Sequence, residues 1–167
     1  MKFCPMCAES HDVRTTVCQS CNYEEKPLSL ISDEEMNELM APYEYELIPD
    51  GVRINGVKNP RSMRGKVAIP HFVTEIAADA LGGCKFLGRL DLPLGLRSIG
   101  DAAFAHCGDL YDVFIPESVS YMGKGVFADC YELRVISAAA PTQPSTWDRE
   151  WLCGCSAGVE WSSTDET

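Results

Sequence analysis

Four cysteines near the start of the chain are spaced as metal ligands. Cys4 and Cys7 are separated by two residues, and Cys18 and Cys21 repeat that spacing after a gap of ten. Two intervening residues let one tight turn present two thiolates to the same ion, so two such turns complete a tetrahedral site of four sulfurs. This ligand set suits Zn²⁺. Since every ligand is a protein thiolate, no position is left for catalysis, and we expect one structural Zn²⁺.

The segment around these cysteines, residues 1–26, has few apolar side chains. Metal binding would therefore supply its folding energy, about 10–16 kcal/mol for a structural zinc. The segment resembles short bacterial zinc-ribbon modules that begin with an FCPxCG-type knuckle, although Ala8 stands where that pattern has glycine. An iron–sulfur site of the rubredoxin kind and a redox C-x-x-C pair are the alternatives; the redox pair lacks the βαβ context that it needs.

Five further cysteines lie later in the chain. Cys84, Cys107 and Cys130 recur every 23 residues, and Cys153 continues that interval. Side chains at equivalent positions of stacked parallel strands point the same way, which suits a disulfide poorly even at the strand spacing of about 4.8 Å. We therefore expect buried free thiols that act as small apolar side chains and give weak S–H hydrogen bonds to turn carbonyls. Cys155 is expected to be the most reactive thiol.

The charge of the chain disfavours polyanionic partners. The formal net charge is −11, and an acidic surface repels phosphate backbones and anionic lipids. No apolar stretch follows the MKFCPMC start as a secretory signal requires, and no window is long enough to span a membrane. We expect a cytoplasmic chain, with cell-surface export only by a route not visible in the sequence, and no nucleic-acid or membrane partner. The densest basic run is Arg53, Lys58, Arg61, Arg64 and Lys66.

Catalytic motifs are missing from the sequence. There is no G-x-S-x-G, no H-E-x-x-H and no phosphate-binding glycine loop. His71 and His106 fall in turns, and no partner carboxylate marks either as part of a dyad. We expect surface imidazoles, no catalytic or cofactor-binding residue and no enzymatic activity.

A linker with a short helix and a hairpin is predicted after the cysteine-rich segment. In residues 27–42, Ser32 and Glu35 make a capping box and Pro42 stops the run, which predicts a helix over residues 33–40. Residues 43–57 alternate in polarity on both sides of a Pro-Asp-Gly turn, which predicts a β-hairpin. Both elements would cap one end of the repeats that follow.

Residues 64–138 repeat with a period of 23 residues. Each repeat is predicted to supply one short strand to a parallel ladder, with the apolar columns in a continuous core. The strands are expected near residues 66–69, 89–92, 112–115, 134–137 and 158–161. Aligned columns include Ile69-Pro70 with Leu92-Pro93 and Ile115-Pro116, and Leu81 with Phe104 and Phe127.

The repeat pattern L-x-x-V-x-I-P-x-x-V-x-x-I-G-x-x-A-F-x-x-C resembles the leucine-rich repeats of the BspA-like bacterial family. Residues 99–107 and 110–116 match it almost fully. The resemblance spans about residues 43–162 and implies an α/β repeat fold, a short leucine-rich-repeat solenoid beside the N-terminal zinc ribbon. The repeat domain would occupy residues 43–161 with a Trp-rich cap over residues 141–161, and residues 162–167 would form a frayed tail.

Solenoids of this kind usually bind partners through the strand face, because it is rigid and extended. The favoured function is a non-enzymatic protein–protein interaction module that is monomeric or weakly oligomeric, with an unidentified protein partner. A zinc-ribbon adaptor for nucleic acid or regulation is the alternative, followed by a thiol- or zinc-dependent enzyme. The outward residues expected to contact the partner are Arg89, Asp91, Asp112, Phe114 and Val135.

Overall fold

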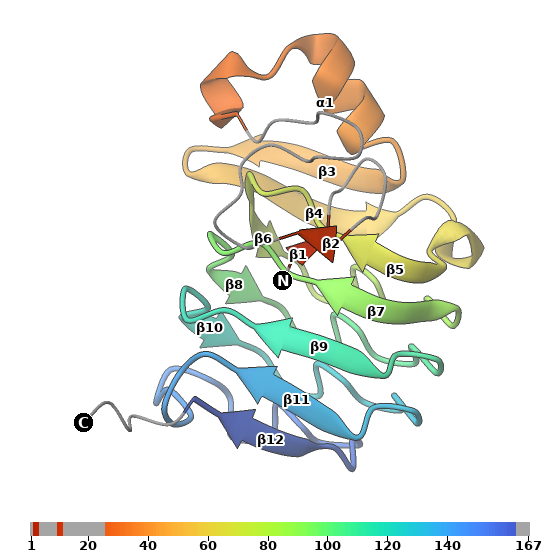
Figure 1. The fold of residues 1–167 in the computed structure, drawn as a ribbon, viewed down its shortest axis with the longest axis vertical. Helices are drawn as coiled ribbons and strands as arrows, with labels where there is room; N and C mark the ends of the chain where they lie inside the picture. The colour runs from red at the N-terminus through yellow and green to blue at the C-terminus, as the bar shows by residue number, and fades with distance from the viewer. Residues whose placement is uncertain (1, 4–9, 12–25, 163–167) are drawn as a thin grey trace.

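The computed structural model describes residues 2–3, 10–11 and 26–162. The chain winds as a stack of coils, with α1 at one end of the stack and β12 at the other (Figure 1). The parallel solenoid predicted from the repeats is therefore confirmed. Cys4, Cys7, Cys18 and Cys21 lie outside the described residues.

The elements follow one another in a simple order. The first part of the chain contains β1 (Lys2–Phe3), β2 (Ser10–His11), the 3-10 helix η1 (Leu28–Leu30), α1 (Asp33–Leu39), β3 (Tyr43–Ile48), β4 (Gly51–Val57) and the 3-10 helix η2 (Pro60–Ser62). The repeats contain β5 (Gly65–Ala68), β6 (Val73–Ile76), β7 (Leu87–Asp91), β8 (Ser98–Ile99), β9 (Asp112–Ile115), β10 (Tyr121–Met122), β11 (Val135–Ala138) and β12 (Gly158–Trp161).

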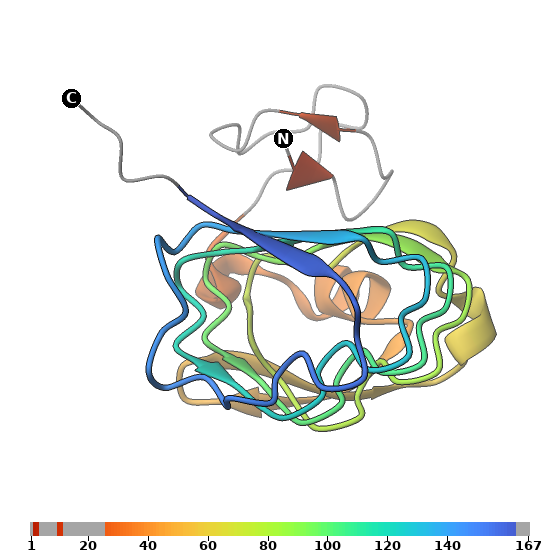
Figure 2. The ribbon, with the colours of Figure 1, turned by 90° about the horizontal axis from the view of Figure 1, so that it is seen from below.

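The coils carry two sheets rather than the single ladder that the sequence predicted. The sheet β12-β11-β9-β7-β5 is the predicted ladder, and we call it the long-strand sheet. A second sheet, β10-β8-β6-β4-β3, runs along the opposite side of the coils (Figure 2). Its repeat strands are only two to four residues long. The apolar column that contains Ile76, Ile99 and Met122 marks these strands, but such short runs have no recognisable alternation in the sequence.

A proline follows each of the strands β5, β7 and β9 and starts a turn. Pro70, Pro93 and Pro116 lack a backbone N–H, so the chain leaves the sheet at these positions without leaving a hydrogen-bond donor unpaired. Their carbonyls accept the turn hydrogen bonds from the amides of Val73, Leu96 and Val119, at 3.0, 3.0 and 3.2 Å. The chain is thereby sent across the core to the second sheet.

Aromatic rings from the turns that follow β8 and β10 stack inside the core. Phe104 and Phe127 are fully buried, and their ring centroids lie 5.5 Å apart at an interplanar angle of 13°. Trp151 meets Phe127 edge to face at 6.2 Å. A buried phenylalanine contributes about 3–5 kcal/mol relative to alanine, so this column joins successive coils strongly.

Helix α1 and the β3–β4 hairpin close the first end of the stack. The Ser32 hydroxyl accepts a hydrogen bond from the Glu35 amide at 3.2 Å, and the Glu35 carboxylate accepts one from the Ser32 amide at 3.0 Å. The helix ends at Leu39, and Met40 caps it while lying fully buried. The hairpin is antiparallel, and β4 continues the second sheet by pairing in parallel with β6.

The last coil departs from the 23-residue register around Trp147. Met122 pairs with Trp147, two positions beyond the residue that the period predicts. The shift is local, because β11 and β12 pair at the 23-residue interval again, with Val135 opposite Gly158. Trp147 is buried and donates its indole N–H to the Val119 carbonyl at 2.9 Å. Its ring lies 5.2 Å from that of Trp151. Ser162, at the start of the predicted frayed tail, still donates its amide to the Ala138 carbonyl at 3.0 Å.

Candidate functional site

The outward columns of the long-strand sheet run straight across successive strands. Arg89 of β7 is paired in register with Asp112 of β9, which is paired with Val135 of β11. Asp91 is likewise paired with Phe114. All five residues expected to contact a partner therefore lie on three adjacent strands of one face (Figure 1).

One ion pair joins two strands of this face. The Arg89 guanidinium lies 3.0 Å from the Asp112 carboxylate, and both side chains are roughly one-third exposed. Such a pair contributes only about 0–1 kcal/mol to stability. Its main effect is to hold the two charges in fixed positions beside the apolar surface.

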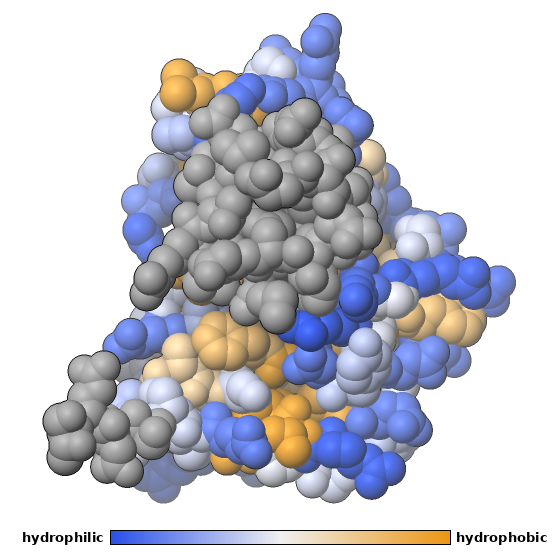
Figure 3. All heavy atoms as spheres, viewed as in Figure 1, coloured by the Kyte–Doolittle hydropathy of each residue, from blue (hydrophilic) through white to orange (hydrophobic). Residues whose placement is uncertain are grey.

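Phe114 forms the wall of a shallow hollow. Its side chain is 41% exposed, and Leu94, at 56%, lies across the same hollow. The hollow has a volume of about 530 Å³, and the remaining lining residues are Pro116, Glu117, Ser118 and Ala139. Apolar surface bordered by polar residues is visible on this side of the molecule (Figure 3). Val135, 40% exposed, does not line this hollow.

Leu94 was missed in the sequence because it lies in a turn. The turns after the first three long strands place His71, Leu94 and Glu117 directly after the proline, so Leu94 is the apolar member of a polar column. An exposed leucine alone is ordinary. Its position opposite Phe114 becomes evident only in the folded chain.

The short N-terminal strand β1 contacts β5 at the first edge of the long-strand sheet. It pairs only with β2 in the described residues. The strands β9 and β11, with Phe114 and Val135, lie farther along the same sheet (Figure 1).

The repeated cysteines form a buried column of thiols. The Cys107 thiol donates to the Leu81 carbonyl with a donor–acceptor distance of 3.3 Å, and the Cys130 thiol donates to the Phe104 carbonyl at 3.1 Å. Hydrogen bonds with the neighbouring thiols of Cys130 and Cys84, together with burial, raise the pKa of Cys107 far above its usual range. This thiol stays protonated and unreactive, as a structural cysteine does.

Cys155, which was expected to be the most reactive thiol, is less exposed than Cys153. Cys153 follows Cys130 by 23 residues, but the local shift around Trp147 leaves the Cys153 side chain exposed. Cys155 is half-buried, and burial raises its pKa. The exposed Cys153 is therefore better placed to react than Cys155.

His106 has the partner carboxylate that the sequence analysis did not find. Its Nδ1 atom lies 3.0 Å from a carboxylate oxygen of Asp129. The two residues occupy equivalent positions in adjacent coils, and both have a left-handed backbone, with φ of 61° and 55°. Both side chains are largely exposed, so the pair is a surface contact between turns.

The part of the chain that the structure describes holds neither a metal cluster nor a membrane-spanning helix. Among these residues no three His, Cys, Asp or Glu side chains converge as ligands. No described helix is long and apolar enough to cross a bilayer.

The stacked coils, the two parallel ladders and the exposed long-strand face define the chain as a leucine-rich-repeat solenoid. The family model described as "BspA type Leucine rich repeat region (6 copies)" matches residues 62–155. The chain belongs to this family.

One solved structure shows the same kind of fold, and two others are similar at lower TM-scores. A leucine-rich repeat protein from Bacteroides capillosus is similar with a TM-score of 0.60 and 26% identity, over 73% of this chain and 95% of that chain. The leucine-rich repeat protein of T. pallidum has 25% identity and a TM-score of 0.31, over 58% of this chain and 69% of its own. The pneumococcal vaccine antigen PcpA has 17% identity and a TM-score of 0.41, over 73% and 38%. No curated protein matches the chain.

Proposed function

We propose that the chain is a non-enzymatic interaction module that binds a protein partner through strands β7, β9 and β11 of the long-strand sheet. The observation that carries this proposal is the Phe114–Leu94 hollow, where two large apolar side chains stay exposed on a rigid face. Exposed apolar surface rimmed by polar residues is typical of protein-binding sites. The hollow offers a socket for one apolar side chain of the partner.

The charges beside the hollow favour a partner segment that carries both an apolar side chain and a basic side chain. Arg89 and Asp112 already pair with each other, so neither presents an uncompensated charge to the partner. Glu117 lies at the rim of the hollow. A partner with an aromatic or aliphatic anchor and a nearby basic group fits this arrangement, since the hot spots of interfaces are apolar anchors surrounded by polar contacts.

A photo-crosslinking experiment tests this proposal. p-Benzoylphenylalanine replaces Phe114 in one variant and Tyr121 in a matched control. Tyr121 lies on β10 of the opposite sheet and is 48% exposed, close to the exposure of Phe114. We expect one protein to be joined covalently from position 114 in the native cells and not from position 121. Equal labelling from both positions would show that the long-strand face has no preferred partner.

We further propose that residues 1–26 form a zinc ribbon with Cys4, Cys7, Cys18 and Cys21 as ligands. The support is the ligand spacing, together with the antiparallel pairing of β1 and β2, which are separated in the sequence by the first C-x2-C pair. Metal analysis of the purified chain should give one zinc per molecule. The double variant Cys4→Ser/Cys7→Ser should lose it, whereas Cys153→Ser should retain it. Intact thiols without metal would refute the ribbon.

A reducing compartment, the cytoplasm, fits the same proposal. Cys84, Cys107, Cys130, Cys153 and Cys155 are all free thiols, and reduced cysteines are usual where thioredoxin and glutathione operate. Fractionation of the native cells with an antibody against the chain checks this, and recovery in the surface fraction would contradict it.

A further inference from the structure

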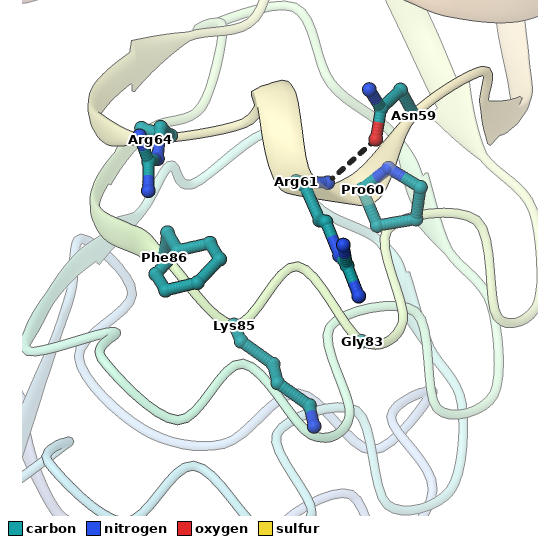
Figure 4. A pocket seen from close by; sticks show the side chains of 7 residues that line it. All are labelled: Asn59, Pro60, Arg61, Arg64, Gly83, Lys85 and Phe86. Atoms are coloured by element: carbon teal, nitrogen blue, oxygen red, sulfur yellow. Dashed lines mark hydrogen bonds between the residues drawn. The ribbon is translucent and has the colours of Figure 1, made fainter.

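A basic hollow lies at the first coil, away from the Phe114–Leu94 hollow. It is formed between η2 and the turn before β7, and it has a volume of about 720 Å³ (Figure 4). This volume is within the range of small-molecule sites, about 300–1,000 Å³. The lining residues are Asn59, Pro60, Arg61, Arg64, Gly83, Lys85 and Phe86.

Local contacts fix the two segments that form the hollow. The Asn59 side-chain oxygen accepts a hydrogen bond from the Arg61 amide at 3.0 Å. The Gly65 amide donates to the Phe86 carbonyl at 2.9 Å, which ties the two segments together. The Arg64 guanidinium carbon lies 4.6 Å from the centre of the Phe86 ring, a cation–π contact. The walls of the hollow are therefore largely preformed.

The cations of this hollow have no carboxylate partner among the described residues. The ion pairs within residues 26–162 do not include Arg61, Arg64 or Lys85. Three positive side chains around one hollow repel one another, and an anion placed among them relieves that repulsion. The concentration of positive charge is notable in a chain whose net charge is −11.

Gly83 leaves open space at the hollow of the first coil. This glycine has a φ of 75°, and a Cβ built on it would meet no atom within 4 Å. The equivalent positions in the next two coils carry the side chains of His106 and Asp129. The Arg61 side chain extends toward the space above Gly83 (Figure 4).

We propose that this hollow binds a small organic anion with a carboxylate or phosphate group and a flat apolar part. The anionic group contacts Arg61 and Lys85, since guanidinium and ammonium groups both recognise these oxyanions. The apolar part packs against Pro60 and Phe86. A small anion is favoured over a nucleic acid because the acidic surface as a whole repels a long polyanion.

Titration of the full chain with three probes, followed by ¹H–¹⁵N spectra, tests the site. Benzoate and phenyl phosphate carry the anionic group on the same ring, and benzamide is the neutral control. We expect saturable shifts of the amides of residues 59, 61–65 and 83–86 with at least one anionic probe, and none with benzamide. The anion that binds more tightly identifies the preferred group. Equal shifts with benzamide, or no saturation with either anion, would overturn the proposal.

Two variants locate the binding. Arg61→Gln should weaken binding of the better probe about tenfold, as expected for loss of a charge-assisted hydrogen bond. Arg149→Gln, at an exposed arginine of the last coil, should leave it unchanged. The amides remote from the hollow report whether each variant is folded. Unchanged affinity in a folded Arg61→Gln variant would refute the assignment.

Discussion

We expect the described thiols to differ in reactivity, because the stacked coils bury Cys84, Cys107 and Cys130 and leave Cys153 exposed. In folded protein treated with iodoacetamide, Cys153 should be alkylated first and Cys155 more slowly, since burial raises the pKa of Cys155. Cys84, Cys107 and Cys130 should be protected until the chain unfolds. Mass spectrometry of the labelled peptides gives the rates. Labelling of Cys107 in the native state as fast as that of Cys153 would contradict the buried column.

Backbone strain gives a second prediction for a single residue. Asp79, Ala102 and Gly125 occupy one column, and all three have a left-handed backbone, with φ between 53° and 59°. This conformation costs an L-residue about 1–2 kcal/mol, whereas glycine adopts it freely. Ala102→Gly should therefore raise the free energy of unfolding by about 0.5–1 kcal/mol, because the greater freedom of the unfolded glycine offsets part of the gain.

Chemical denaturation of matched variants measures this effect. Ala78→Gly, at an exposed alanine outside the set of positive-φ residues, is the control and should lower stability. If both glycine variants lose stability alike, the turn at Ala102 is not strained.

At the scale of elements, the capping box of α1 is a separate source of stability for the first end of the stack. Ser32→Ala removes the acceptor of the Glu35 amide and should lower the free energy of unfolding by about 1 kcal/mol. Hydrogen bonds from Lys26 and from the Ser32 amide lower the pKa of Glu35. The stabilisation by ionised Glu35 is thus present at neutral pH and is lost as the pH falls through this depressed pKa.

The free energy of unfolding, measured as a function of pH, separates the contribution of the Glu35 charge from that of the Ser32 hydrogen bond. The difference between the wild type and Glu35→Gln should shrink as the pH falls below the usual range of a glutamate, while Glu38→Gln, on the same helix, should differ little from the wild type at any pH. A constant difference for Glu35→Gln would exclude the charge of Glu35 as its cause.

The elements also show how far the sequence could predict the fold. The long strands and the outward columns follow from a strict period, because each side chain in a repeat meets its equivalent in the next coil. The capping box follows from the spacing of Ser32 and Glu35. The second sheet escaped prediction because its strands are two to four residues long. The local shift in the last coil escaped because Cys153 and β12 both keep the 23-residue interval, while the structure pairs Met122 with Trp147 between β10 and β12.

The candidate site was only partly predictable, because the repeat period applies to its strand residues and not to its turn residues. Phe114 was found because it lies on a periodic strand, whereas Leu94 and the basic hollow lie in turns, where no period indicates which side chains meet. Arg61 and Arg64 were visible as part of a basic run. Their convergence with Lys85 depends on the neighbouring coil, which only the folded chain brings into contact.

On the scale of the whole molecule, the solenoid is a rigid support that carries two distinct surfaces. One is the apolar hollow of the long-strand face, and the other is the basic hollow of the first coil. They have no lining residue in common. Loss of one is therefore expected to leave the other intact.

The most direct test of the account is the affinity of the protein that crosslinks at position 114, measured by calorimetry with the wild type and two variants. Phe114→Asp places a charge in the apolar hollow and should weaken binding tenfold or more, as expected for a buried interface anchor. Tyr121→Asp, of similar exposure on the opposite sheet, should bind as the wild type does. Equal affinity of the wild type and Phe114→Asp would contradict binding through the long-strand face.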